Sequence, residues 1–233
     1  MLEVKVWGDW ACFTRPENKA ERVSYDVMTP SAARGVLEAI FWKPEFRWQV
    51  REIWVLKPIR HFSILRNEVG SAASVRAAHG WQDSDGHYYA DANNERGRTQ
   101  RHSLLLRDVS YLIRAEIDLA AHATDPVFKY RDQFRRRVQR GQCHHAPYLG
   151  TREFSAYFAP PDGNEKPIPV TDDLGRVLFD VFYTREKGGP VLFAQHDSTG
   201  TNWVEGRARP RFFSARLESG ILRIPRSLYE EVS

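Results

Sequence analysis

The sequence predicts an α+β protein: a ferredoxin-like domain with an inserted β-hairpin arm, followed by a small C-terminal β subdomain. Three observations predict it. Several segments alternate apolar and polar side chains with the period of a strand. Two others repeat apolar residues at helical spacing. In chain order the elements follow as β-α-β-β-α-β, the order of a four-stranded sheet with two helices on one face.

The first strand, first helix and second strand are expected in the first quarter of the chain. Residues 2–13 alternate apolar with charged side chains, which is typical of a strand. Thr29-Pro30-Ser31 is a helix-start signal. The helix should end at Trp42-Lys43, because Pro44 disfavours helical geometry in the residue before it. The alternation of residues 46–56 predicts the second strand.

Residues 60–103 differ from the rest of the chain because Gly, Asn, Asp, Arg and His dominate them. Such a polar segment cannot form core, and Asp85-Gly86 is a hairpin turn signal. We therefore expect a protruding β-hairpin arm, inserted between the second strand and a third. The strict alternation of residues 105–119 predicts that third strand.

The second helix should begin at Asp125-Pro126 and end at Gly141, since glycine is favoured just past a helix end. Its apolar residues form one stripe that should face the core, namely Val127, Tyr130, Phe134 and Val138. Residues 152–158 predict a fourth strand. The resulting domain also has the architecture of RNA-recognition motifs.

Two structural units are expected, residues 1–159 and residues 160–233. Four prolines among residues 160–169 preclude regular structure and predict a linker. Beyond it, short segments with strand character predict the small β subdomain, namely residues 177–183, 191–194, 211–217 and 221–224.

The composition favours a polyanionic partner. The 34 basic residues comprise 27 Arg and 7 Lys, against 30 acidic residues. Arg grips phosphate bidentately and stacks on bases, whereas Lys acts as a point charge. Abundant Arg can also reflect a GC-rich genome. We find no secretory signal, no apolar run of the ~18 residues that a membrane span needs, and two distant cysteines, so a cytoplasmic location without a membrane partner is expected.

Two clusters of basic residues are candidate RNA-binding surfaces. The first lies on the second helix, where Lys129, Arg136 and Arg140 should share the face opposite the apolar stripe, and it also includes Arg131, Arg135 and Arg137. The second lies on the arm and its return strand and comprises Arg96, Arg98, Arg101, His102 and Arg107. Trp81, Tyr88 and Tyr89 stand nearby, and cations beside stacking aromatics are typical of RNA binders. The alternatives are an ordinary solvated helix face and aromatics that only pin the arm to the body.

No metal or cofactor is expected. Cys143, His144 and His145 are potential zinc ligands, but three adjacent residues cannot easily converge on one ion. RNA can be cut without metal if a base deprotonates the 2′-hydroxyl and a cation stabilises the negative charge that develops on the phosphate. Lys129 next to Tyr130 meets this requirement, although the helical count also allows Tyr130 to be a core residue. His144 and His145 are alternative proton carriers.

Five strings stand in order over roughly residues 1–160. They are Gly8-Asp9 with Phe13-Thr14, Ala39-Ile40-Phe41-Trp42-Lys43-Pro44, Leu56-Lys57-Pro58-Ile59, Leu105-Leu106-Arg107-Asp108-Val109 and Tyr148-Leu149-Gly150-Thr151-Arg152-Glu153-Phe154. Together they resemble the Cas-five family of type I-C CRISPR systems, within a superfamily of RNA-binding proteins built on RRM-like domains. The resemblance implies an endoribonuclease that cleaves precursor CRISPR RNA at the base of the repeat hairpin without metal. It also implies that the protein stays on the 5′ handle, beside the backbone and large subunits of a surveillance complex.

The catalytic set implied by the resemblance is a Tyr in the string that closes the first helix and a Lys-His pair that opens the second. By position these are Phe41, Lys129 and Tyr130, so Lys129 alone matches. Either Tyr130 acts as the base beside Lys129, or His144 or His145 completes the site. The alternatives to an endoribonuclease are a noncatalytic RNA-binding subunit of the same complex and a DNA-binding or DNA-cutting protein.

Overall fold

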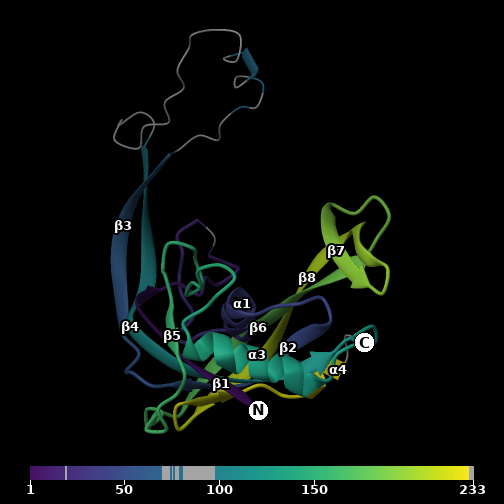
Figure 1. Cartoon of the computed structure of the whole chain (residues 1–233). Helices are drawn as coiled ribbons and strands as arrows, with labels where there is room; N and C mark the ends of the chain where they lie inside the picture. The colour runs from purple at the N-terminus through teal and green to yellow at the C-terminus, as the bar shows by residue number, and fades with distance from the viewer. Residues whose placement is uncertain (19, 70–73, 75, 77–78, 81–97, 231–233) are drawn as a thin grey trace.

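The structure is a computed structural model that describes residues 1–233 except 19, 70–73, 75, 77–78, 81–97 and 231–233 (Figure 1). Its helices are α1 (Pro30–Ile40), α3 (Val127–Gln139) and α4 (Ser227–Glu230). Its strands are β1 (Leu2–Ala11), β2 (Phe46–Val55), β3 (His61–Val69), β4 (Arg98–Leu119), β5 (Tyr157–Ala159), β6 (Asp172–Arg185), β7 (Val191–Asp197), β8 (Gly200–Glu218) and β9 (Ile221–Arg223). No helix in these ranges is long and apolar enough to cross a membrane.

The described strands form one antiparallel sheet. Its order is β5-β1-β4-β2-β9-β8-β6, with β3 paired to β4 and β7 paired to β8. Helix α1 contacts β2 and β6, α3 contacts β1, β4 and β5, and the two helices contact each other, so both cover the same face. The predicted α+β class is therefore confirmed in its coarser form, as a sheet-rich antiparallel fold with few helices.

The core lies between this face and the two helices, and β1 shows how the sequence builds it. Leu2, Val4 and Val6 are buried, whereas Glu3 and Lys5 between them are only half-buried. Successive side chains of a strand point to opposite faces, so the alternation sends one set into the core. Removing such apolar surface from water is the main favourable contribution to folding.

Helix α1 begins where the sequence predicts and ends earlier than expected. The Thr29 hydroxyl accepts a hydrogen bond from the Ala32 amide at 3.2 Å, which caps the first turn. The helix ends at Ile40 rather than at Trp42-Lys43, because Phe41 is already extended, with φ −154°. The Trp48 indole Nε1 donates to the Phe41 carbonyl at 2.9 Å and holds that residue against β2.

The predicted strand at residues 152–158 is mostly wrong. Only Tyr157–Ala159 pairs with β1, whereas residues 149–154 form a turn in which the Leu149 amide donates to the Phe154 carbonyl at 2.8 Å. Gly150 adopts φ +89°, and a Cβ there would lie 2.0 Å from the Cys12 carbonyl oxygen. The close approach of two backbones, rather than strand pairing, determines the conformation of this segment.

The base of the predicted arm is an antiparallel ribbon. Strand β3 pairs with the first part of β4, from His61 opposite Leu106 to Val69 opposite Arg98. In Figure 1 this ribbon and the β7/β8 hairpin project to the same side of the molecule from different parts of the sheet. The expected turn at Asp85-Gly86 and the expected arm residues Trp81, Tyr88, Tyr89 and Arg96 lie outside the described residues.

The strands expected in the C-terminal part are present, and they extend the same sheet. Strand β9 pairs with β2, and β8 and β6 follow it outward. The expected boundary near residue 160 falls in a segment without helix or strand. Arg34 of α1 also reaches β6, where its Nε and Nη2 atoms donate to the Asp180 carboxylate at 2.8 and 2.9 Å.

We predict that Asp180→Ala lowers the free energy of unfolding by about 1–2 kcal/mol, because it removes a bidentate, charge-assisted contact that is partly screened by solvent. Urea denaturation followed by circular dichroism measures it. Glu186→Ala is the matched control, since it breaks the exposed pair between Glu186, which follows β6, and Arg207 of β8, and should have the smaller effect. Equal effects of the two variants would contradict the prediction.

The segment between β5 and β6 is fastened to β1 through Glu165. This carboxylate accepts from the amides of Asp162 at 2.9 Å and Gly163 at 3.0 Å, and it lies 3.2 Å from the Lys5 ammonium. Burial alone would raise the pKa of Glu165, but the amide donors and Lys5 outweigh it and lower the pKa to about 2.

Stability should therefore depend on pH through Glu165. Its folded-state pKa is below the unfolded value of ~4.3, so its contribution is present above that pH and is lost as the pH falls toward 2. The native protein should lose on the order of 2 kcal/mol more than Glu165→Gln between pH 5 and pH 2. Thermal unfolding of both proteins across this range checks the result, and parallel pH profiles would contradict it.

Candidate active site and nucleic-acid interface

Lys129 lies on the first turn of α3 and points into solvent. Its side chain is 59% exposed, and its ammonium is 2.8 Å from the Asp125 carboxylate, one turn back along the chain. The hydrogen bond and the charge of Asp125 raise the pKa of Lys129 above its usual value. The residue is therefore a stable cation that an incoming phosphate can reach.

Tyr130, the next residue, is turned into the core and is 1% exposed. Its ring lies 5.3 Å from the Phe46 ring, and the Lys43 ammonium sits 5.7 Å above it. Its hydroxyl is buried and has no hydrogen bond of ordinary geometry with a described residue. Burial, together with the carboxylates of Glu45 and Asp125, raises the pKa of Tyr130 above its ordinary value. A phenol in this setting is a weak base at neutral pH.

The rings of Phe41 and Tyr130 both pack against the ring of Phe46. Phe41 is buried, and its ring lies 5.3 Å from Phe46, as the Tyr130 ring does on its own side. The Arg137 guanidinium covers the Phe41 ring at 5.1 Å and donates to the Ile40 carbonyl at 2.8 Å. The structure thus brings the two positions together around Phe46, and it uses Arg137 to close the end of α1.

His144 and His145 lie at the same end of α1. Their amides donate to the Ala39 carbonyl at 2.8 and 3.3 Å, and their side chains are exposed with ring centroids 5.7 Å apart. The Ala39 carbonyl, two positions before Phe41, therefore holds both histidines at the end of the helix, with their imidazoles facing solvent. Two of the proton carriers considered from sequence are therefore accessible, whereas the Tyr130 hydroxyl is not.

The predicted RNA-binding residues differ in how far they are already engaged. Arg136 and Arg140 are exposed and make no ion pair with the part of the chain that the structure describes. On the arm, Arg101 pairs with Glu68 at 3.3 Å, and Arg107 lies 6.0 Å from the Phe62 ring centroid. His102 is exposed and Arg98 is half-buried. The cations at the C-terminal end of α3 are thus more available to a ligand than those of the arm.

Several cations on the face of the sheet opposite the helices are already paired. Arg114 of β4 bridges Glu3 and Glu52, each at 2.8 Å. Arg51 contacts Glu116 at 2.8 Å, and Arg226 contacts the same carboxylate at 3.0 Å. Because these three charges are neutralised locally, a polyanion gains less by approaching them than by approaching the cations of α3 that make no ion pair with a described residue.

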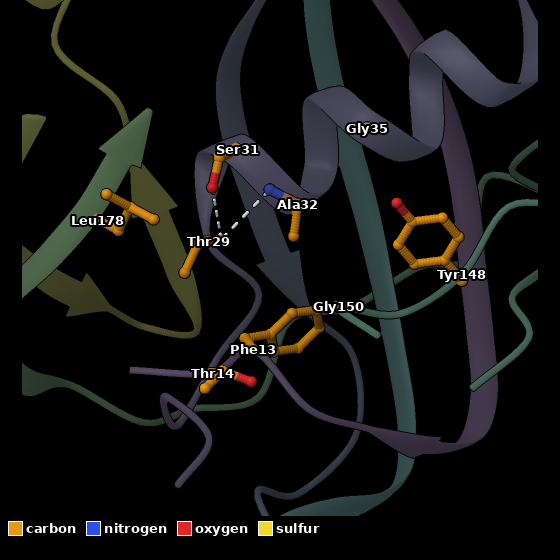
Figure 2. Close-up of a pocket in the computed structure, with 9 residues that line it drawn as sticks. All are labelled: Phe13, Thr14, Thr29, Ser31, Ala32, Gly35, Tyr148, Gly150 and Leu178. Carbon is orange, nitrogen blue, oxygen red and sulfur yellow. Dashed lines mark hydrogen bonds between the residues drawn. The ribbon is translucent and has the colours of Figure 1, made fainter. Parts of the chain in front are cut away.

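A cavity of about 280 Å³ lies at the N-terminal end of α1, and sequence analysis missed it. Figure 2 shows the residues that line it. Thr29 caps the helix there, Tyr148 faces it across the opening, and Gly150 borders it. The string around Tyr148 and Gly150 is one of the five that carry the family resemblance, so it was the sequence signal that could have pointed to this cavity. Residues of the first and last of the five strings, Phe13 and Thr14 with Tyr148 and Gly150, line this cavity together.

A larger cavity, of about 460 Å³, lies between the segment that follows α1 and the β7 strand. We call it the Trp42 cavity, after the exposed aromatic residue on its wall. Phe46 also lines it, so one ring separates this cavity from Phe41 and Tyr130. No sequence pattern predicts the Trp42 cavity, because its walls come from segments far apart in the chain.

Comparisons with known proteins identify the class. Residues 1–225 match a family described as CRISPR-associated protein (Cas_Cas5), so the chain belongs to this family. A protein of Thermus thermophilus, named CRISPR pre-crRNA endoribonuclease Cas5d, is 50% identical over 231 residues, which cover 99% of this chain and 94% of the relative. A protein of the same name from Mannheimia succiniciproducens is 39% identical over 241 residues, covering 99% and 97%. The expected membership in the type I-C branch is confirmed.

Solved structures agree on the fold. A functionally uncharacterized protein, SMU1763c from Streptococcus mutans, aligns with a TM-score of 0.60 at 18% identity, covering 96% of this chain and 91% of that one. A structure described as a CRISPR-associated protein aligns equally well, with a TM-score of 0.60 at 20% identity and coverage of 96% and 90%. At these identities the likeness supports the fold alone.

Proposed function

We propose that the chain is a CRISPR pre-crRNA endoribonuclease. The observation that carries the proposal is the 50% identity, over 99% of the chain, to a protein that bears this name. The exposed cations of α3 add a surface that suits a polyanionic substrate. Cleavage falls at the base of the repeat hairpin, and the protein then remains on the 5′ handle.

The proposed reaction needs no metal. A base removes the proton of the 2′-hydroxyl, the oxygen attacks the adjacent phosphorus, and the 5′ oxygen of the next nucleotide leaves with a proton. Lys129 stabilises the negative charge that develops on the phosphate. The exposed imidazoles of His144 and His145 are better placed to exchange protons with solvent and substrate than the buried phenol of Tyr130.

We predict that Tyr130→Phe keeps the cleavage rate within about threefold of the native value. Its hydroxyl is buried and has no hydrogen bond of ordinary geometry with a described residue, so its removal should neither take away a base nor destabilise the core. Single-turnover cleavage of repeat RNA, with thermal unfolding as the control for folding, measures this. A loss of about 100-fold, the scale of general base catalysis, would instead make Tyr130 the base.

Two finer features of the fold belong to the same proposal. The order β5-β1-β4-β2, with α1 after β1 and α3 after β4, supports a ferredoxin-like domain with the β3/β4 arm as its insertion. The division into residues 1–159 and 160–233 is supported by the irregular segment that follows β5. The proposed partners are the repeat hairpin, the 5′ handle, and the backbone and large subunits of a type I-C surveillance complex.

Incubation of the purified protein with repeat RNA in excess EDTA tests the proposal. We expect cleavage at one position, a 2′,3′-cyclic phosphate on the upstream product, and no cleavage of RNA with a 2′-deoxy nucleotide at the scissile position. Cleavage that EDTA abolishes would contradict the metal-free mechanism. Tight binding without any cleavage would favour the noncatalytic subunit.

The second candidate function is a noncatalytic RNA-binding subunit of the same complex, and the two departures from the family's catalytic set favour it. At two positions of the family's catalytic set, this chain has Phe41, which lacks a hydroxyl, and Tyr130, whose hydroxyl is buried. A DNA-binding role is separated by competition, since phosphate contacts alone do not distinguish the sugars. Duplex DNA should compete weakly at physiological salt, and equal competition would support the DNA alternative.

A further inference from the structure

The Trp42 cavity has exposed aromatic walls. Trp42 is 42% exposed and meets the His196 ring edge-on, with centroids 5.2 Å apart. Tyr183 at the far end of β6 is 50% exposed, and its ring is tilted by 30° against Phe193 of β7 at 5.4 Å. Aromatic faces left open in a cavity are costly to hydrate and suit a planar ligand that stacks on them.

The cavity is also cationic. Arg47 of β2 and Arg185 of β6 line it, together with His122 and His196, and none of its lining residues is acidic. The Arg185 Nε donates to Gln195 at 2.8 Å, which fixes the guanidinium beside the rings. Arg47 is exposed and makes no ion pair within the described ranges. Two guanidinium groups without a neutralising carboxylate among the lining residues favour an anionic ligand.

His122 adds an independent sign of a missing partner. Its Nε2 atom is buried and has no hydrogen bond with any described residue, although the residue lines the cavity. Buried polar atoms are nearly always paired, since an unpaired one costs about 1–3 kcal/mol. Because this atom is closed to solvent, the imidazole would have to turn toward the cavity before a polar edge of a ligand could pair with it.

We propose that the Trp42 cavity holds one unpaired nucleotide of the RNA, with its base against Tyr183 and its phosphate toward Arg47 and Arg185. The volume of about 460 Å³ lies within the range of small-ligand sites. Phe46 lines the cavity and contacts both Phe41 and Tyr130, the positions at which the family resemblance implies catalytic side chains, so we infer that the nucleotide flanks the scissile bond. The inference rests on the proposed function and adds a base-binding site to it.

An abasic scan of the substrate tests the cavity. Repeat RNAs carrying a 2′-deoxy block at the scissile position and a single abasic site at successive positions are bound to the native protein and to Tyr183→Ala. We expect one position near the scissile bond at which base removal weakens native binding by about 5–100-fold, since base stacking contributes ~1–3 kcal/mol. The same removal should have little effect in Tyr183→Ala, because the two changes delete the same contact.

Trp203→Ala is the matched control, since Trp203 of β8 is an aromatic residue that is 68% exposed and does not line the cavity. In Trp203→Ala, removal of the base at that position should weaken RNA binding as much as it does in the native protein. Arg185→Gln provides a second variant and should reduce the salt dependence of binding by about one phosphate contact.

The outcomes separate this inference from the proposed function. If native protein binds and cleaves repeat RNA but no abasic position is coupled to Tyr183, the cavity does not hold a base and the function stands. Coupling at a position inside the paired stem would also overturn the inference. If native protein neither prefers nor cleaves repeat RNA, the proposed function itself fails.

Discussion

Lys129→Ala should lower the single-turnover cleavage rate of repeat RNA by about 100–1,000-fold, the scale on which one preorganised electrostatic contact contributes to catalysis. The ammonium is exposed on the first turn of α3, and Asp125 keeps it charged, so the substitution removes a cation that the phosphate can reach. RNA binding should weaken far less, because Arg136 and Arg140 remain exposed on the same helix. The effect should therefore appear in the rate at saturating protein.

Arg135→Ala is the control for this substitution. Arg135 is an exposed cation of α3 that also pairs with a nearby carboxylate, Asp132 at 3.2 Å, but it lies more than one turn further along the helix. It should change the rate by less than about threefold. Equal losses of cleavage rate in the two variants would mean that α3 acts through its total positive charge rather than through Lys129. An unchanged rate in Lys129→Ala would show that Lys129 is not part of the active site.

Trp48→Ala should lower the free energy of unfolding by about 3–5 kcal/mol, the usual range for deleting a buried aromatic side chain. Trp48 is 1% exposed, and its ring packs edge-on against Phe134 at 4.8 Å and Phe46 at 5.6 Å. Its Nε1 atom also satisfies the Phe41 carbonyl where α1 ends. Chemical denaturation at neutral pH measures the loss.

Trp48→Phe separates packing from the hydrogen bond. It keeps an aromatic ring in the core and removes the donor to Phe41, so it should cost about 1–3 kcal/mol. If this variant is as unstable as Trp48→Ala, the hydrogen bond rather than the packed ring determines the stability of the end of α1. If Trp48→Ala costs less than about 1 kcal/mol, well under the usual range for a buried aromatic, the core described around Phe46 is wrong.

Strands and helices with one apolar face could be predicted from the sequence, because their periodicity is set by the core. The alternation before residue 56 predicted β1 and β2 to within two residues, and the stripe from Val127 to Val138 predicted α3. Strand β4 is longer than expected. Its first residues, from Arg98, pair only with the arm strand β3 and bury no apolar face there, so they carry no alternation to recognise.

The site could be predicted only in part. Helical spacing left Tyr130 open as either a base or a core residue, and only the packing against Phe46 shows that its side chain is buried. The pairing of Arg101 with Glu68 depends on the register of two strands, which the sequence does not determine. The Trp42 cavity depends on how β7 is placed over the end of α1, so no local pattern encodes it.

The pairing of β2 with β9 has a consequence for synthesis on the ribosome. β2 emerges early, whereas its neighbours β4 and β9 follow much later, and β9 is complete only at residue 223. Until then an edge of an apolar strand stays open, a state that invites wrong pairing with other nascent chains. The β2 edge of the sheet therefore cannot close before residue 223 has been synthesised.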